Sequence, residues 1–68
     1  MRLKWVKKVI IDILKENNRG ISLARLPKLI SRRVNFTFDI QDLGFLKLKN
    51  LLKTIEGVWI ENDGTTYA

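Results

Sequence analysis

The 68-residue sequence contains no cysteine and no histidine. The chain therefore forms no disulfide, carries no thiolate nucleophile and lacks the residues of the usual zinc sites. Carboxylates are the remaining candidates for catalysis, and their positions have simpler explanations. Asp39 and Asp42 lie where a helix would begin, and Glu61 and Asp63 lie at a turn. We therefore predict no catalytic residue, no metal and no cofactor, so that the protein is not an enzyme.

Long hydrophobic runs are also absent, and none approaches the length of a membrane span. Residues 1–14 are basic and then apolar, as in a signal peptide, but Asp12 interrupts the apolar run and no small-residue cleavage site follows. The core of so short a chain needs the apolar face of this segment, so we expect no membrane binding. We predict a soluble, single domain over residues 1–68, because the length leaves no room for a second.

Positive charge is in excess and unevenly placed. The net charge is +6, yet residues 1–38 hold ten Lys or Arg against two acids, a net +8, whereas residues 39–68 hold three Lys against five acids, a net −2. A basic half of this kind indicates a polyanionic partner, nucleic acid before an anionic membrane surface. The alternative is that these side chains only solvate helix surfaces, and charge alone does not decide between the two.

Three segments repeat apolar residues at the spacing of a helix. Residues 3–16 form the first predicted helix. Ser22 is the predicted N-cap of the second, which runs to about residue 33 and loses one backbone hydrogen bond at Pro27. The third predicted helix is strongest over residues 44–55.

The segment before the third helix, residues 34–40, has the propensity of a strand but no partner of matching length. We predict an irregular connection here, with Asp39 as the cap at the start of the third helix. Four aromatic residues are assigned to the core: Phe36, Phe38, Phe45 and Tyr67.

A β-hairpin is predicted at the end of the sequence. Residues 58–61 and 65–67 form its strands, and Asn62-Asp63-Gly64 joins them. Asp-Gly is the preferred pair for a tight type I′ turn. The order of elements is helix, short strand, helix, helix and hairpin. This order predicts an α+β fold, a small winged helix-turn-helix with the hairpin as its wing.

Two runs of residues resemble one known family. Gly20-Ile21-Ser22-Leu23-x-x-Leu26-Pro27 resembles the entry to the second helix of LOTUS domains, also called OST-HTH domains. Asp42-Leu43-Gly44-Phe45-x-Lys47-Leu48-x-x-Leu51-Leu52 resembles their signature third helix. The spacing between the runs and the closing hairpin also suit the family, and the resemblance covers roughly residues 6–67. The match depends on both runs occurring in order.

The resemblance implies a domain of germline and RNA-regulatory proteins. Extended members carry an additional C-terminal helix and bind a DEAD-box helicase of the Vasa type. Minimal members lack that helix and bind G-rich and G-quadruplex RNA. This chain resembles the minimal form, because its sequence stops directly after the hairpin. The resemblance thus implies an RNA-binding module in the cytoplasm, ribonucleoprotein granules included.

The predicted RNA-binding surface consists of cations on the second and third helices. These are Arg25, Lys28 and Arg32, spaced as one row on the second helix, with Lys47, Lys49 and Lys53 on the third. Such side chains hold phosphates by charge and do not specify a sequence. The acidic wing tip, residues 61–64, disfavours a duplex DNA laid across the wing.

Trp59 completes the predicted RNA-binding set. Strand alternation turns Trp59 outward if Val58 and Ile60 face the core. An exposed indole stacks on a base or on a G-quartet, although Trp59 is equally suited to cover the edge of the first helix against Trp5.

A protein partner is the alternative function. Leu46 is predicted to be exposed among lysines, where LOTUS domains usually have a polar residue. It is therefore the candidate contact for a DEAD-box helicase or another protein, and the edge of the hairpin offers a route to self-association.

Overall fold

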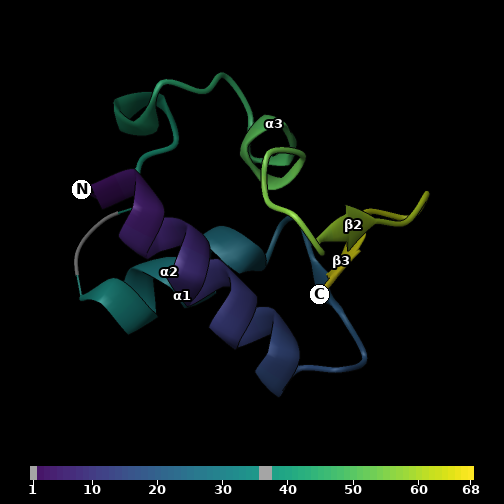
Figure 1. The fold of residues 1–68 in the computed structure, drawn as a ribbon. Helices are drawn as coiled ribbons and strands as arrows, with labels where there is room; N and C mark the ends of the chain where they lie inside the picture. The colour runs from purple at the N-terminus through teal and green to yellow at the C-terminus, as the bar shows by residue number, and fades with distance from the viewer. Residues whose placement is uncertain (1, 36–37) are drawn as a thin grey trace.

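The computed structural model describes residues 2–35 and 38–68. In this part of the chain, helix α1 (Arg2–Glu16) leads through strand β1 (Ile21–Ser22) to helix α2 (Leu26–Val34). A single 3₁₀ turn, η1 (Gln41–Leu43), precedes helix α3 (Leu48–Leu52). Strands β2 (Trp59–Ile60) and β3 (Thr65–Tyr67) form the hairpin. Figure 1 shows α1 running across the molecule, with α2 packed behind it and the hairpin to the right.

The sheet is antiparallel, and the last strand lies in its middle. Its order is β1-β3-β2, so β3 pairs with strands from both ends of the chain. Thr66 lies opposite Ile21 on one side and Ile60 on the other. The Leu23 N–H donates to the Gly64 carbonyl at 2.9 Å and extends the β1–β3 pairing beyond the strands. Three helices and this sheet form the predicted α+β fold, a winged helix-turn-helix arrangement.

Helix α2 begins three residues later than the sequence indicated. The Ser22 hydroxyl accepts the Arg25 N–H at 3.3 Å and so closes a turn in front of the helix, while Arg25 is the N-cap. The prediction of Ser22 as N-cap was therefore wrong. The physical reason is Pro27, which has no N–H to donate and is tolerated in the first helical turn. With the helix beginning at Leu26, Pro27 costs no helical hydrogen bond.

Helix α3 is much shorter than the predicted residues 44–55. Gly44 has a φ of +87°, and Lys47 is extended with φ −138° and ψ 151°, so no helix passes through them. Beyond Leu52 the chain continues in tighter turns, with the Ile55 N–H donating to the Leu52 carbonyl. The prediction of Asp39 as the cap of the third helix was wrong, because Lys47 is the N-cap of α3. The Asp39 carboxylate instead accepts the Gln41 N–H at 2.9 Å and closes a turn in front of η1, whose N-cap is Ile40.

The hairpin turn also differs from the prediction. The Gly64 N–H donates to the Glu61 carbonyl at 2.9 Å, and Gly64 has a φ of +86° whereas Asp63 has no positive φ. A type I′ turn needs positive φ at both central residues. The observed loop is instead the three-residue type, in which a left-handed glycine follows a type I turn.

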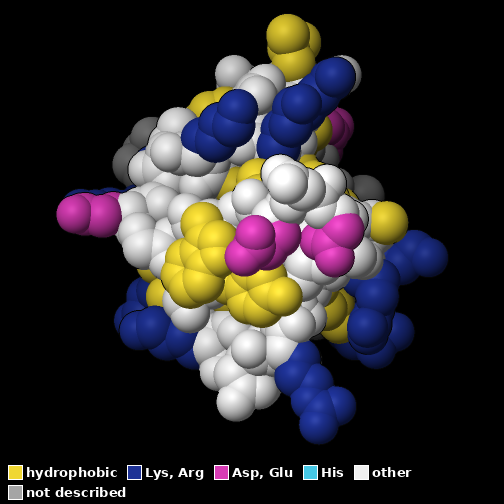
Figure 2. All heavy atoms as spheres, turned by 90° about the vertical axis from the view of Figure 1, so that its right-hand side faces the viewer, with side chains coloured by type: hydrophobic (Ala, Val, Ile, Leu, Met, Phe, Trp, Pro, Cys, Tyr) yellow, Lys and Arg dark blue, Asp and Glu magenta, His cyan; other side chains and the backbone are white. Residues whose placement is uncertain are grey.

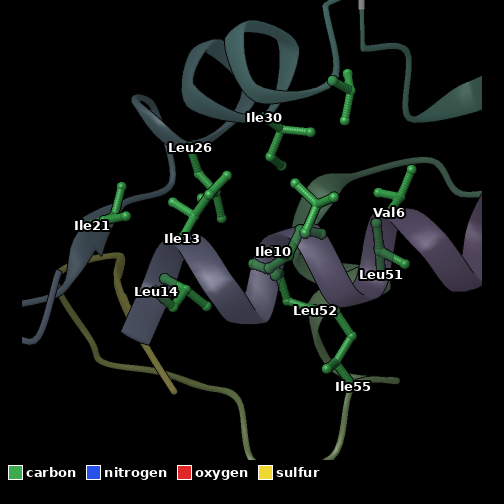
Figure 3. Packing of buried hydrophobic residues seen from close by; sticks show 12 residues of the cluster. Val6, Ile10, Ile13, Leu14, Ile21, Leu26, Ile30, Leu51, Leu52 and Ile55 are labelled. Atoms are coloured by element: carbon green, nitrogen blue, oxygen red, sulfur yellow. The ribbon is translucent and has the colours of Figure 1, made fainter. Parts of the chain in front are cut away.

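The core lies between the three helices and the inner face of the sheet (Figure 3). Its buried residues are Val6, Val9, Ile10, Ile13, Leu14, Ile21, Leu26, Ile30, Val34, Leu51, Leu52 and Ile55. Phe38 and Phe45 are partly buried against this cluster, as predicted. Phe36 lies outside the described residues. The assignment of Tyr67 to the core was wrong: because Thr66 is the inward residue of β3, Tyr67 projects from the opposite face.

Thr66 places a hydroxyl in the core without a partner. The side chain is fully buried, and its Oγ1 makes no hydrogen bond within the described residues. Burial of an unpaired hydroxyl costs free energy that a methyl group in its place does not.

We therefore expect Thr66→Val to raise the free energy of unfolding by about 1 kcal/mol, or the Tm by about 4–8 °C for a domain of this size. Thr66→Ser keeps the hydroxyl and loses a buried methyl group, so it is expected to lower the Tm instead. Urea and thermal unfolding followed by circular dichroism measure both. A less stable Thr66→Val variant would show that the hydroxyl is hydrogen-bonded.

Candidate nucleic-acid interface

The cations of α2 form a row on the outside of the helix. Arg25, Lys28 and Arg32 are all exposed, and their spacing of three and four residues places them on one face. Arg25 has helical dihedral angles although it is the N-cap, so it continues the row. Within the described residues none of the three forms an ion pair. Their positive charge is therefore available to a ligand.

Arg33, the next cation of α2, is already paired. Its guanidinium donates to both carboxylate oxygens of Glu16 at the end of α1, at 2.5 and 3.1 Å. This hydrogen bonding lowers the pKa of the Glu16 carboxyl and raises the pKa of Arg33. The pair is exposed, so it contributes little to stability. Its clearer effect is to cancel the charge of Arg33, so that among the described residues at this end of α2 Arg32 is the cation without an ion pair.

A pocket lies beside Arg32, between the ends of α1 and α2. Its volume is about 330 Å³. It is lined by Ile13, Glu16, Asn17, Leu29, Arg32 and Arg33. The pocket next to the basic row is therefore lined by both aliphatic and polar side chains.

The lysines predicted on the third helix are exposed, but only one belongs to α3. Lys49 lies within the helix, whereas Lys47 and Lys53 are its flanking cap residues. Figures 1 and 3 show α2 and α3 packing on α1 from different directions. The six cations therefore form two groups, the α2 row and the lysines around α3. Leu46, beside the second group, is 82% exposed, as predicted.

Helix α1 carries a third basic group that the site prediction left out. Lys4, Lys8 and Lys15 are exposed along it. The sequence did signal this group, because the net charge of +8 over residues 1–38 includes the first helix. The α2 row differs from this group in that its Arg32 lines the pocket between the ends of α1 and α2.

The hairpin presents a surface of a different kind. Trp59 is 52% exposed, and its ring stacks on that of Tyr67 with centroids 5.6 Å apart and planes at 17°. The outward direction of Trp59 is confirmed, and its stacking partner is Tyr67. Strand alternation places Glu61 on the same side as Trp59, and Thr65 on the same side as Tyr67. We call these four residues the outer hairpin face.

Acidic groups surround the outer hairpin face. Figure 2 looks at this side of the molecule and shows hydrophobic side chains gathered beside acidic ones, with basic side chains toward the edges. Glu61 and Asp63 are both exposed. The Asp63 carboxylate accepts the Thr65 N–H at 2.9 Å, and this hydrogen bond lowers the pKa of Asp63. Asp63 thus stays negatively charged near neutral pH.

Across residues 2–35 and 38–68, no helix is long and apolar enough to cross a membrane. The same residues contain no group of three acidic side chains placed to hold a metal ion.

Fold and surface together define a small winged-helix module with a basic helical side and an acidic, aromatic wing. The chain matches the sequence profile of the OST-HTH/LOTUS domain over residues 1–66, and it belongs to this family. LOTUS domains are modules that bind RNA or proteins and are not a catalytic family. No significant match was found among curated proteins or among solved structures.

Proposed function

We propose that this LOTUS domain binds RNA through the α2 row, with the lysines around α3 as a second contact. The observation that carries the proposal is the α2 row itself: three exposed cations on one helix face, none paired within the described residues. Cations in a row hold successive phosphates and release the counterions around them. The proposed setting is a cytoplasmic ribonucleoprotein of a germline or RNA-regulatory pathway.

The pocket beside Arg32 supports a single-stranded or looped RNA. Its half-buried Leu29 offers an apolar contact to the face of an unstacked base, while Arg32 holds the neighbouring phosphate. Resemblance to the LOTUS domains that bind RNA adds G-rich and G-quadruplex RNA as the preferred ligands. Duplex DNA is disfavoured, because Glu61 and Asp63 lie on the wing that would approach its backbone.

The first test compares three labelled ligands by fluorescence anisotropy at matched salt: a G-quadruplex RNA, an unstructured RNA and a DNA duplex. We expect the G-quadruplex RNA to bind most tightly. Replacement of Arg25, Lys28 and Arg32 by glutamine is expected to weaken its binding about tenfold or more and to reduce the salt slope by roughly 2 to 3, since each phosphate contact contributes about 0.7 on a single strand and about 0.9 on a duplex.

Two matched variants show where the RNA lies. Glutamine at Lys4, Lys8 and Lys15 removes the same net charge from α1, and we expect it to weaken binding much less. Glutamine at Lys47, Lys49 and Lys53 is expected to have an intermediate effect. An equal loss in all three variants would mean that overall charge, and no particular surface, attracts the RNA. Circular dichroism confirms that each variant is folded.

Protein binding is the second candidate function, because a leucine that is 82% exposed is unusual among lysines. Leu46 would contact a DEAD-box helicase or another protein. Self-association would use the hairpin edge, where β2 is an outer strand of only two residues. If the folded domain binds none of the three nucleic acids, this candidate replaces the first.

A further inference from the structure

The outer hairpin face is chemically unlike the RNA surface proposed above. Residues 54–68 contain three acids and no Lys or Arg, in a chain whose net charge is +6. The largest exposed aromatic side chain of this segment, Trp59, lies among them. Phosphate groups would be repelled here, whereas a cationic ligand would be attracted.

We propose that the outer hairpin face, Trp59 and Tyr67 with Glu61 beside them, binds an arginine-rich segment of a partner protein. A guanidinium group is planar, stacks on aromatic faces and donates to carboxylates in a forked geometry. The face offers an aromatic ring for stacking and a carboxylate for hydrogen bonding. The exposed indole of Trp59 and the exposed carboxylate of Glu61 lie two residues apart on one side of the hairpin.

Tyr67 makes the indole a better platform for the guanidinium. The two rings are nearly parallel at 17°, so Trp59 is supported on one side by Tyr67. Tyr67 in turn is held against the backbone at Gly20, where an added Cβ would lie 2.7 Å from its ring. The platform is therefore largely ordered before the ligand arrives, which reduces the entropy lost on binding.

Charge selects the occupant further. Asp63 adds a second carboxylate at the tip of the hairpin, and the Thr65 N–H donates to it at 2.9 Å. Glu61 has no ion-pair partner within the described residues. A peptide with several arginines therefore finds one aromatic platform and two carboxylates, while its glycines or serines would let the chain follow the short hairpin.

The test uses ¹⁵N-labelled protein and a short peptide in which arginines alternate with glycine and serine. The protein has two indole N–H signals in its ¹H–¹⁵N spectrum, from Trp5 and Trp59, and Trp→Phe variants assign each signal to its residue. We expect the peptide to shift the Trp59 indole signal and the amide signals of residues 59–67, and to leave those of α2 unchanged. A matched lysine peptide is expected to bind about twofold to fivefold more weakly, because ammonium groups do not stack.

Glu61→Gln with Asp63→Asn removes both charges while keeping side-chain oxygens that accept hydrogen bonds. This variant is expected to bind the arginine peptide about fivefold more weakly. Trp59→Ala should lower the affinity to a similar extent. Unchanged affinity in the charge variant, or no shift at Trp59, overturns the proposal.

Two further outcomes would assign the face to another occupant and also overturn the proposal. If G-quadruplex RNA shifts the Trp59 indole and Trp59→Ala weakens RNA binding, the face belongs to RNA. If the Trp59 signal moves with protein concentration alone, a second copy of the chain covers it. Neither outcome depends on the α2 row, so failure here and failure of the proposed RNA surface are distinguishable.

Discussion

Replacing Gly20 by alanine is expected to lower the free energy of unfolding by about 2–5 kcal/mol. Gly20 has a φ of +88°, which an L-residue with a side chain adopts only at a cost. An added Cβ would also overlap the Thr65 methyl group and lie 2.7 and 2.8 Å from two atoms of the Tyr67 ring. That ring is stacked on Trp59, so moving it away from an added Cβ would disturb the stacked pair. Urea unfolding at 25 °C measures the loss.

Gly44→Ala and Gly57→Ala provide the matched controls. Their φ values are +87° and +86°, but an added Cβ would meet nothing within 4 Å. They share the backbone strain and lack the overlap, so each should cost only about 1–2 kcal/mol. If all three alanine variants lose the same stability, Tyr67 is not packed on Gly20, and the ordered aromatic platform proposed for arginine binding loses its support.

Leu52→Ala is expected to cost about 2–5 kcal/mol and to leave little or no folded protein at 37 °C. Leu52 is fully buried, and truncation leaves a cavity in the core. A 68-residue domain has only about 3–10 kcal/mol of stability in total. Helix α3 has five residues, too few to be stable alone, so packing through Leu51 and Leu52 is what forms it.

Leu46→Ala is the control for Leu52→Ala. It is the same substitution, six residues earlier, at a side chain that is 82% exposed. We expect no measurable change in thermal unfolding, because almost no apolar area leaves the core. A large loss at Leu46 would show that this leucine packs against the domain, and it would then not be available to a protein partner.

The sequence predicted the regular parts of the fold well because the core contacts follow simple periods. The apolar residues of α1 repeat at helical spacing over about three turns, and Val6, Val9, Ile10, Ile13 and Leu14 are all buried. The buried side of α2 was equally clear from Leu26, Ile30 and Val34. In both helices the period continues long enough for local propensity and packing to agree.

The boundaries of α2 and α3 could not be predicted with the same success, because single residues set them. Pro27 moves the start of α2 to Leu26, past the better capping residue Ser22. At α3 the apolar spacing from Phe45 to Ile55 is helical, and those residues do face the core. The backbone reaches the same burial by a left-handed Gly44, an extended Lys47 and a short helix, and periodicity does not distinguish these paths.

For the candidate site, exposure was predictable and pairing was not. The row spacing of Arg25, Lys28 and Arg32 follows from the helix period, and all three are exposed. The contact of Arg33 with Glu16 joins residues seventeen positions apart. It depends on how α1 and α2 cross, so no local pattern signals it. The alternation of β3 about Thr66 was available in the sequence and would have turned Tyr67 outward.

The central position of β3 has a consequence for synthesis on the ribosome. Strand β1 and all three helices leave the exit tunnel before residues 65–67, yet neither β1 nor β2 has a strand partner until β3 arrives. The nascent chain therefore holds two unpaired strand edges, and its helices lack the inner face of the sheet, until Tyr67 has emerged. The domain can therefore complete its fold only after the last strand has been translated. Until then, a chaperone that binds the nascent chain would contact basic helices that are not yet covered by the hairpin.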